Sequence, residues 1–204
     1  MVQQVTSFLL PFVLLLCLWQ LQEGVQACNC LARHPQQVFC QNDVVIRAKV
    51  VGRKDDPRHG LIQYNIKQTK MFKGPKKDFN AIYTASNAAA CGVKLTKGTT
   101  YLLMAKRDSD GLLRITLCDF FQQWKALSDG QTSLLRHYEM SCDCTIKLCP
   151  SLPCGISSPT ECLWTDFLPI KLASGEQTKN FACVKKGYGH CAWFRGAGSP
   201  TYSK

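Results

Sequence analysis

Cysteine constrains this chain more than any other residue type. The sequence contains 13 cysteines, of which Cys17 alone precedes residue 28. Twelve therefore lie at residue 28 or later. An even number of closely spaced cysteines in an exported protein predicts a disulfide framework formed in an oxidising compartment. A zinc site is the competing interpretation, because Cys142 lies close to Cys144, and Cys149 to Cys154, in the sequence. The absence of a CxxC pair counts against zinc.

An apolar run comes before these cysteines. Phe8–Leu18 is almost continuously apolar, but it is shorter than the about 20 residues that span a bilayer. Val25–Ala27 then supplies the small residues of a cleavage site. We therefore predict a signal peptide over residues 1–27 and a protein secreted to the extracellular space or matrix. An uncleaved anchor is the alternative, because Met1–Ser7 carries no Lys or Arg.

The remaining cysteines divide the chain into two halves. The first six are widely spread and the second six are crowded, so we place a boundary at Asp143. This gives an N-terminal domain over residues 28–143, long enough for its own core, and a C-terminal domain over 144–204 that needs disulfides for stability. No long Pro, Gly or Ser linker separates them, so we expect the halves to sit rigidly together.

Alternating apolar and polar residues predict a mainly β first half. Five segments with strand composition are separated by turn signals: Asp43–Val51, Leu61–Phe72, Phe79–Thr84, Thr100–Lys106 and Leu112–Leu117. Five short strands at this spacing predict a small antiparallel barrel. Trp124–Tyr138 has the apolar spacing of a helix, although Gly130 weakens that prediction. We expect the second half to consist of short hairpins and turns.

Enzyme signatures are absent from the sequence. The four histidines form no HExxH pair, and neither a GxSxG elbow nor a phosphate-binding loop is present. The carboxylates are too scattered to identify a general acid and base. We predict that the chain is not an enzyme, has no catalytic residues and uses no cofactor of its own.

Cleavage before Cys28 would create a chemically useful N-terminus. The new α-amine would have a pKa of about 7.7–8.0, and with the carbonyl oxygen of the same residue it would form a bidentate metal ligand. A catalytic zinc keeps one coordination position open for water, which such a ligand would displace. The alternative is that Cys28 and Cys30 only staple the terminus to the barrel. The chemistry of these residues leaves both interpretations open.

Long motifs follow one another from Cys28 to the C-terminal region. They are Cys28-x-Cys30-x3-His34-Pro35-Gln36-x3-Cys40, Asp43-x2-Ile46-Arg47-Ala48-Lys49, Lys70–Gly74, Cys91-Gly92, Asp110-Gly111, Glu161–Asp166 and Cys191–Gly196. Together with the register of the cysteines, they resemble the tissue inhibitors of metalloproteinases. Within that family the chain is most similar to the second paralogue, on the segments Ile66–Gln68, Lys73–Pro75, Ile115–Phe120 and Ile156–Pro159.

The resemblance implies a fold and a set of disulfides. The fold is mainly β with a few helices: a five-stranded oligonucleotide/oligosaccharide-binding (OB-fold, netrin-like) barrel, followed by a small disulfide-rich β-hairpin domain. The implied disulfides are Cys28–Cys91, Cys30–Cys118, Cys40–Cys142, Cys144–Cys191, Cys149–Cys154 and Cys162–Cys183.

The resemblance also implies a mechanism of inhibition. The Cys28 amine and carbonyl would chelate the zinc of a matrix metalloproteinase in a one-to-one complex, and the side chain of residue 29 would enter the adjacent substrate pocket. An inhibitory ridge would fill the neighbouring subsites with Cys28, Asn29, Cys30, Leu31, Ala32, Arg33, Ala88, Ala89, Ala90, Cys91 and Gly92. Binding of a gelatinase proenzyme through the C-terminal domain is a further implied interaction.

Four features depart from the family pattern. Asn29 stands where Thr or Ser is usual, so the affinity and the range of targets are open to change. Ala32 replaces a usual Pro, and Gly52–Gly60 is much shorter than the hairpin expected of the second paralogue. The tail Ser199–Lys204 is basic where that paralogue has a longer acidic tail, which argues against the proenzyme interaction.

The chain is strongly basic, with a formal net charge of +11. A charge of this size favours binding to polyanions, which outside the cell means sulfated glycans. We therefore predict retention on heparan sulfate and no interaction with nucleic acid. The alternative is a solvated basic surface that binds no specific ligand. A netrin-like matrix-binding module with weak or no inhibition is the second functional interpretation. The candidate glycan-binding residues are Lys67, Lys70, Lys73, Lys76, Lys77, Lys185, Lys186 and Arg195.

Overall fold

The computed structural model describes residues 28–170 and 175–197. The predicted signal peptide (1–27) and the basic tail (Ser199–Lys204) lie outside these ranges. Within them, every helix is too short or too polar to cross a membrane.

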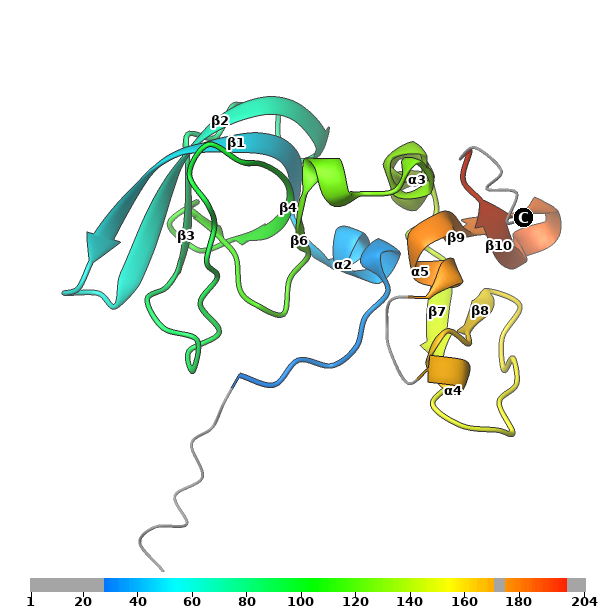
Figure 1. Cartoon of the computed structure of the whole chain (residues 1–204). Helices are drawn as coiled ribbons and strands as arrows, with labels where there is room; N and C mark the ends of the chain where they lie inside the picture. The colour runs from blue at the N-terminus through cyan, green and yellow to red at the C-terminus, as the bar shows by residue number, and fades with distance from the viewer. Residues whose placement is uncertain (1–27, 171–174, 198–204) are drawn as a thin grey trace, which may run out of the picture.

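Five strands close into a ring within one sheet (Figure 1). The pairing order is β1-β2-β3-β5-β4, and β4 pairs back onto β1. Each of the five segments predicted as strands overlaps one of them, although β1 continues to Asp56, beyond its predicted end at Val51. The short strand β6 (Phe121–Gln123) adds to the outside of β4. The ring consists of β1 (Val44–Asp56), β2 (Leu61–Lys73), β3 (Ala81–Ala85), β4 (Thr100–Arg107) and β5 (Leu113–Arg114).

The sequence predicts an antiparallel ring, but one contact between strands is parallel. Tyr83 of β3 pairs with Arg114 of β5 in the parallel sense, whereas the other pairs in the ring are antiparallel. The reason is geometric, because an odd number of strands cannot alternate in direction at every contact around a closed ring. One parallel contact is therefore a necessary consequence of closing five strands.

Alternate residues of the strands fill the inside of the ring. Val44, Ile46, Ala48 and Val50 of β1 are fully buried there, as a period of two requires. The Tyr64 hydroxyl also reaches across the interior, donating to the Val93 carbonyl at 3.2 Å and accepting from the Leu95 N–H at 3.1 Å. These bonds hold residues 93–95 against the barrel, and they thereby fix the C-terminal end of the preceding loop, residues 88–92.

The helix α2 (Pro35–Gln41) was not predicted from the sequence. It has a Pro at its first position, which suits a helix start. His34 caps it, because its Nδ1 accepts the Gln36 N–H at 3.2 Å while the Gln37 side chain accepts the His34 N–H at 2.9 Å. At the other end, the Lys73 ammonium donates to the Phe39 and Cys40 carbonyls, and its burial lowers its pKa.

The second helix of the first half is shorter than predicted. α3 runs over Asp129–Met140, while Trp124–Ala126 forms a separate 3-10 turn, η1. The Ser128 hydroxyl accepts the Gln131 N–H at 3.0 Å, and the Gln131 side chain accepts the Ser128 N–H at 3.0 Å. This capping box starts the helix at Asp129, so Trp124 lies outside it.

The second half consists of short elements, as predicted. One pair of strands forms an antiparallel hairpin, but the other pair is parallel and is joined by a disulfide-closed loop. The elements are β7 (Thr145–Leu148), β8 (Glu161–Trp164), α4 (Phe167–Ile170), α5 (Glu176–Asn180), β9 (Phe181–Lys185), η2 (Gly187–Gly189) and β10 (Cys191–Arg195).

A shared hydrophobic cluster joins the two halves. Ala182 and Val184 of β9 pack with residues of α2, α3 and β4, and α3 lies between the ring and the second half (Figure 1). The buried Gln36 side chain adds two hydrogen bonds of 2.7 Å to the backbone of Cys183. These contacts cross the boundary at Asp143 and hold the halves together.

His34 is buried at this junction. Its Nε2 lies 3.0 Å from the Gln177 carbonyl, and its ring contacts Tyr138, Trp164 and Trp193 at centroid distances of 5.4 to 6.3 Å. Burial lowers the pKa of His34 to about 4, so the ring is neutral at physiological pH. The bond that the Gln36 N–H donates to Nδ1 leaves the proton on Nε2, which donates to Gln177.

We expect the protein to lose stability as the pH falls from about 6.5 to about 4. In this range the unfolded chain takes up a proton at His34 while the folded protein keeps the ring neutral, so acid favours unfolding. The free energy of unfolding should fall by up to about 1.4 kcal/mol per pH unit. Denaturant titrations at neutral pH and at about pH 5 measure the difference.

Two variants provide the control for this prediction. His34→Asn keeps a side chain that can cap α2 but cannot take up a proton, and His190→Gln replaces an exposed histidine. The first should flatten the pH dependence and the second should preserve it. An equally steep dependence in His34→Asn would show that the acid sensitivity arises elsewhere.

Candidate functional site

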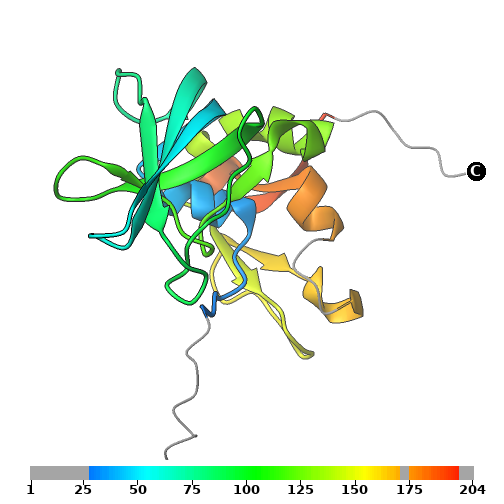
Figure 2. The ribbon, with the colours of Figure 1, turned by 60° about the vertical axis from the view of Figure 1, so that its left-hand side comes forward.

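Two disulfides fasten the first described segment to the barrel. Cys28 is joined to Cys91 and Cys30 to Cys118, across sequence separations of 63 and 88 residues. Residues 28–33 therefore lie beside the loop 88–92, at the lower edge of the molecule in Figure 2. The sequence-predicted ridge residues are thus brought together from two distant parts of the chain.

All twelve cysteines of the described chain are in disulfides, in the same six pairs that the family resemblance implies. The sulfur atoms of Cys28, Cys91 and Cys118 lie within 4.8 Å of one another, but disulfide sulfurs are not thiolate ligands. The competing prediction of a zinc site rested on Cys142, Cys144, Cys149 and Cys154, and it is wrong because all four are in disulfides. The remaining pairs are Cys40–Cys142, Cys144–Cys191, Cys149–Cys154 and Cys162–Cys183.

The ridge presents small and apolar side chains to solvent. Asn29, Cys30 and Ala32 are exposed, and the Leu31 side chain is 89% exposed. Ala88–Ala90 are exposed as well. Leu31 and the row of small side chains therefore form an accessible edge, which a partner protein can reach without moving other parts of the chain.

Local hydrogen bonds fix the loop that carries the three alanines. The Asn87 side chain accepts the Ala90 N–H at 2.8 Å, and the Asn87 carbonyl accepts the Gly92 N–H at 2.9 Å. Cys91 has a φ of 60°, the left-handed region that non-glycine residues rarely adopt. A Cβ on Gly92 would collide with the Ala85 carbonyl oxygen and lie 2.7 Å from that of Asn87, so only glycine fits there.

A second set of bonds holds the N-terminal segment from its other end. The Arg33 guanidinium donates to the Cys118 carbonyl and, at 2.7 Å, to the Gln41 side chain. The Leu117 N–H donates to the Cys91 carbonyl at 2.9 Å. Residues 117 and 118 therefore contact both segments of the ridge and set the distance between them.

The sequence indicated the ridge but not the residues that shape it. Asn87, before the three alanines, is the kind of residue that starts an Asx turn, so its role was detectable. The role of Cys118 as the acceptor for Arg33 depends on the folded backbone and had no signal in the sequence.

The structure separates the predicted basic residues into groups. Lys67 and Lys70 project from β2, and Lys76 and Lys77 lie in the loop that follows. The Lys73 ammonium differs from these, because it donates to the Phe39 and Cys40 carbonyls at the end of α2. In the second half, Lys185 forms a 3.3 Å ion pair with Asp143, while Lys186 lies over Phe194 and Arg195 over Phe181.

The model of the tissue inhibitor of metalloproteinase family matches residues 26–193. The chain belongs to this family. It is 50% identical over 197 residues to metalloproteinase inhibitor 2 of Cavia porcellus, and equally to that of Homo sapiens, in each case covering 91% of this chain and 90% of the relative. Metalloproteinase inhibitor 2 of Gallus gallus is 46% identical over 185 residues, which covers 85% of this chain and 84% of the relative.

Membership of the tissue inhibitor family agrees with the sequence prediction that the chain is not an enzyme. The relatives are named as protein inhibitors, and the matched region spans both halves of this chain. The chain therefore belongs to a family of protein inhibitors, so we look for its function in its exposed surfaces rather than in a catalytic site.

We expect Gly92→Ala to disrupt the ridge. The added methyl group collides with the carbonyl groups of Ala85 and Asn87, so the loop must shift and the free energy of unfolding should fall by about 2 kcal/mol or more. Gly187→Ala is the matched control, because nothing lies within 4 Å of a Cβ at that position, and its effect should stay within about 0.5 kcal/mol. Equal effects of the two changes in denaturant titrations would contradict the proposed constraint.

Proposed function

We propose that this chain inhibits zinc matrix metalloproteinases by placing its ridge in their active-site cleft. The observation that carries the proposal is the fixed, solvent-exposed edge made by residues 28–33 and 88–92, bridged by the Cys28–Cys91 disulfide. A preorganised edge loses little conformational freedom on binding. The names of the relatives, metalloproteinase inhibitor 2, identify the class of target.

The proposed inhibitory group is the main chain of Cys28. The free α-amine and the carbonyl oxygen of one residue are spaced to chelate a single metal ion. They would occupy the open position of the protease zinc and displace its water. The neutral amine is the ligand, so binding releases a proton where the amine is charged. The Cys28 sulfur takes no part, since it is held in a disulfide.

The neighbouring side chains would fill the substrate subsites. Asn29 is exposed beside Cys28 and would enter the pocket next to the zinc. Leu31, which is 89% exposed, would supply most of the apolar contact from its segment. Ala88–Ala90 would pack alongside, where their small side chains allow the two backbones to approach closely.

The remaining family properties are part of the same proposal. The closed ring of five strands with one parallel contact supports an OB-fold, netrin-like barrel as the scaffold of an N-terminal domain. The apolar N-terminal run supports secretion, with cleavage exposing the Cys28 amine. For the C-terminal domain, over residues 144–204, a gelatinase proenzyme is the partner that the family resemblance implies, and the basic tail Ser199–Lys204 argues against it.

An added residue before Cys28 tests the chelation directly. We expect protein that begins at Cys28 to inhibit an active matrix metalloproteinase stoichiometrically. A version with one extra alanine before Cys28 should lose inhibition by at least about a thousandfold, because its amide nitrogen cannot coordinate the zinc; this corresponds to about 4 kcal/mol of binding free energy. Titration of the enzyme with each form measures the effect, and equal inhibition by both forms would exclude chelation by the amine.

We also expect Asn29→Thr to tighten inhibition by about tenfold. The Asn amide loses water when it enters the substrate pocket and must find new hydrogen-bond partners there. Thr has a single hydroxyl and a smaller volume, so it should be desolvated at lower cost, with a gain of about 1.4 kcal/mol. Inhibition constants against two or more metalloproteinases measure the change. Unchanged or weaker inhibition by Asn29→Thr would show that this amide finds good partners in the pocket.

A further inference from the structure

Two residues of the ridge are held only at the ends of their segment. Leu31 and Ala32 are exposed, so packing against the barrel does not order them. Within the described chain, neither residue forms a hydrogen bond through its main chain. The disulfide of Cys30 anchors the segment on one side, and the first buried residue on the other side is His34. Arg33, the residue between, is placed to restrain this exposed span.

The Arg33 side chain reaches back to the fixed part of the molecule. Its guanidinium donates to the Cys118 carbonyl and, at 2.7 Å, to the side-chain oxygen of Gln41 at the end of α2. Cys118 is also the disulfide partner of Cys30. The segment from Cys30 to Arg33 is therefore closed into a loop on Cys118, by a covalent bond at one end and a hydrogen bond at the other.

Arginine suits this contact because one rigid, planar group reaches two acceptors. Its Nη1 donates to Gln41 and its Nη2 to Cys118, a geometry that a single ammonium on a flexible stem does not reproduce. A charged donor also strengthens both hydrogen bonds. Both acceptors are neutral, and none of the ion pairs among the described residues includes Arg33. The contact therefore depends on shape and hydrogen bonding rather than on a charge pair.

We propose that Arg33 is a positioning residue that orders the exposed part of the ridge for inhibition. This inference rests on the proposed function, in which the ridge enters the cleft of a metalloproteinase. A segment that samples many arrangements binds more weakly, in proportion to the fraction of molecules in the competent one. By holding residues 31 and 32 in one arrangement, Arg33 raises that fraction, and it does so without contacting the zinc.

The same contact accounts for the alanine at position 32. The family pattern has a proline there, whose ring fixes its own φ and restricts the preceding residue as well. With Ala32 the chain has neither restraint at this point. The side chain of the next residue restrains the same span through its two hydrogen bonds, so Arg33 replaces the restraint that the proline would supply.

Arg33→Gln, made with and without a proline at position 32, tests this replacement. Glutamine is shorter and has no guanidinium fork, so it does not reach both acceptors. We expect its inhibition constant against an active matrix metalloproteinase to rise about tenfold, which corresponds to a tenfold smaller competent fraction. In the Ala32→Pro background the same change should raise the constant by about twofold or less, because the proline already restrains the span.

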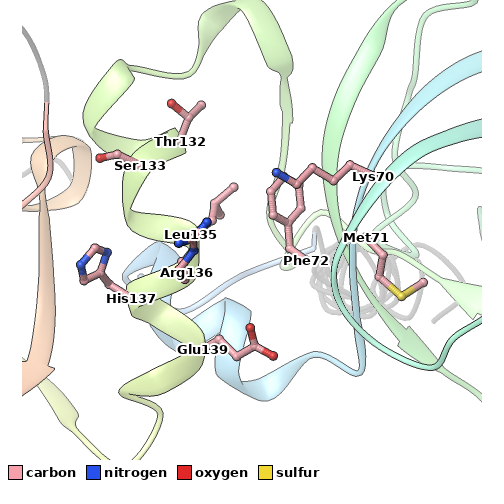
Figure 3. Close-up of a pocket in the computed structure, with 9 residues that line it drawn as sticks. All are labelled: Lys70, Met71, Phe72, Thr132, Ser133, Leu135, Arg136, His137 and Glu139. Carbon is pink, nitrogen blue, oxygen red and sulfur yellow. The ribbon is translucent and has the colours of Figure 1, made fainter.

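Two further variants separate the contact from the positive charge. Arg33→Lys keeps the charge but lacks the fork, so it should weaken inhibition nearly as much as Arg33→Gln. Arg136→Gln removes the same charge from α3, where this exposed side chain borders a cavity of about 380 Å³ between β2 and α3 (Figure 3). α3 lies at the top of the molecule in Figures 1 and 2 and the ridge segment at the bottom, so Arg136→Gln should inhibit like the unmodified protein.

Backbone order parameters from nitrogen-15 relaxation measure the restraint without a protease. The amides of residues 31 and 33 should have values of about 0.85 in the unmodified protein, as in rigid backbone, and below about 0.6 in Arg33→Gln. In the double variant Ala32→Pro/Arg33→Gln they should return toward the rigid value. The amide of the buried Ile46 should stay rigid in every variant, which distinguishes a local effect from a general loss of structure.

The outcomes distinguish this inference from the proposed function. If Arg33→Gln inhibits like the unmodified protein, or if Arg33→Lys does so while Arg33→Gln does not, the hydrogen-bonded contact does not position the ridge. An equal cost of Arg33→Gln in both backgrounds would overturn the replacement of the proline. If the unmodified protein does not inhibit, the proposed function fails and the role of Arg33 in inhibition fails with it. Unchanged order parameters in Arg33→Gln would overturn the restraint itself, whatever the protein inhibits.

Discussion

The ridge depends on the covalent attachment of the first described residues to the barrel. A chain end normally frays, but here Cys28 and Cys30 are bridged to Cys91 and Cys118. In the chain-entropy treatment a loop of this length contributes about 4 kcal/mol by restricting the unfolded chain. The local result matters more for function, since two segments far apart in sequence form one edge whose shape is set before any partner arrives.

The rest of the fold supports that edge from behind. The segment continues through Arg33, which is bonded to the Cys118 carbonyl, into His34, which is buried against aromatic rings of the second half. The second half of the chain therefore supports the ridge, because it packs against His34 and α2, which directly follow the ridge segment 28–33. Packing of the two halves buries the His34 ring, and this burial lowers its pKa and keeps it neutral. The stability of the junction between the halves therefore depends on pH.

Part of this architecture could be predicted from the sequence. The alternation of apolar and polar residues predicted β1 and β2, because the side chains of one face are buried inside the ring and those of the other face lie outside it. α2 was missed because a helix of 7 residues shows too few turns for a periodic pattern, and α3 was extended too far because Trp124 happened to fit the helical spacing. The ridge was located through its family motifs.

The central claim is that the main chain of Cys28 is the inhibitory ligand. A crystal structure of the mature protein bound to the catalytic domain of a matrix metalloproteinase tests it most directly. The account predicts that the Cys28 nitrogen lies about 2.0–2.1 Å from the zinc, with the carbonyl oxygen of the same residue also coordinated and no water on the metal. A complex in which the zinc keeps its water, or in which the ridge lies outside the cleft, would contradict it.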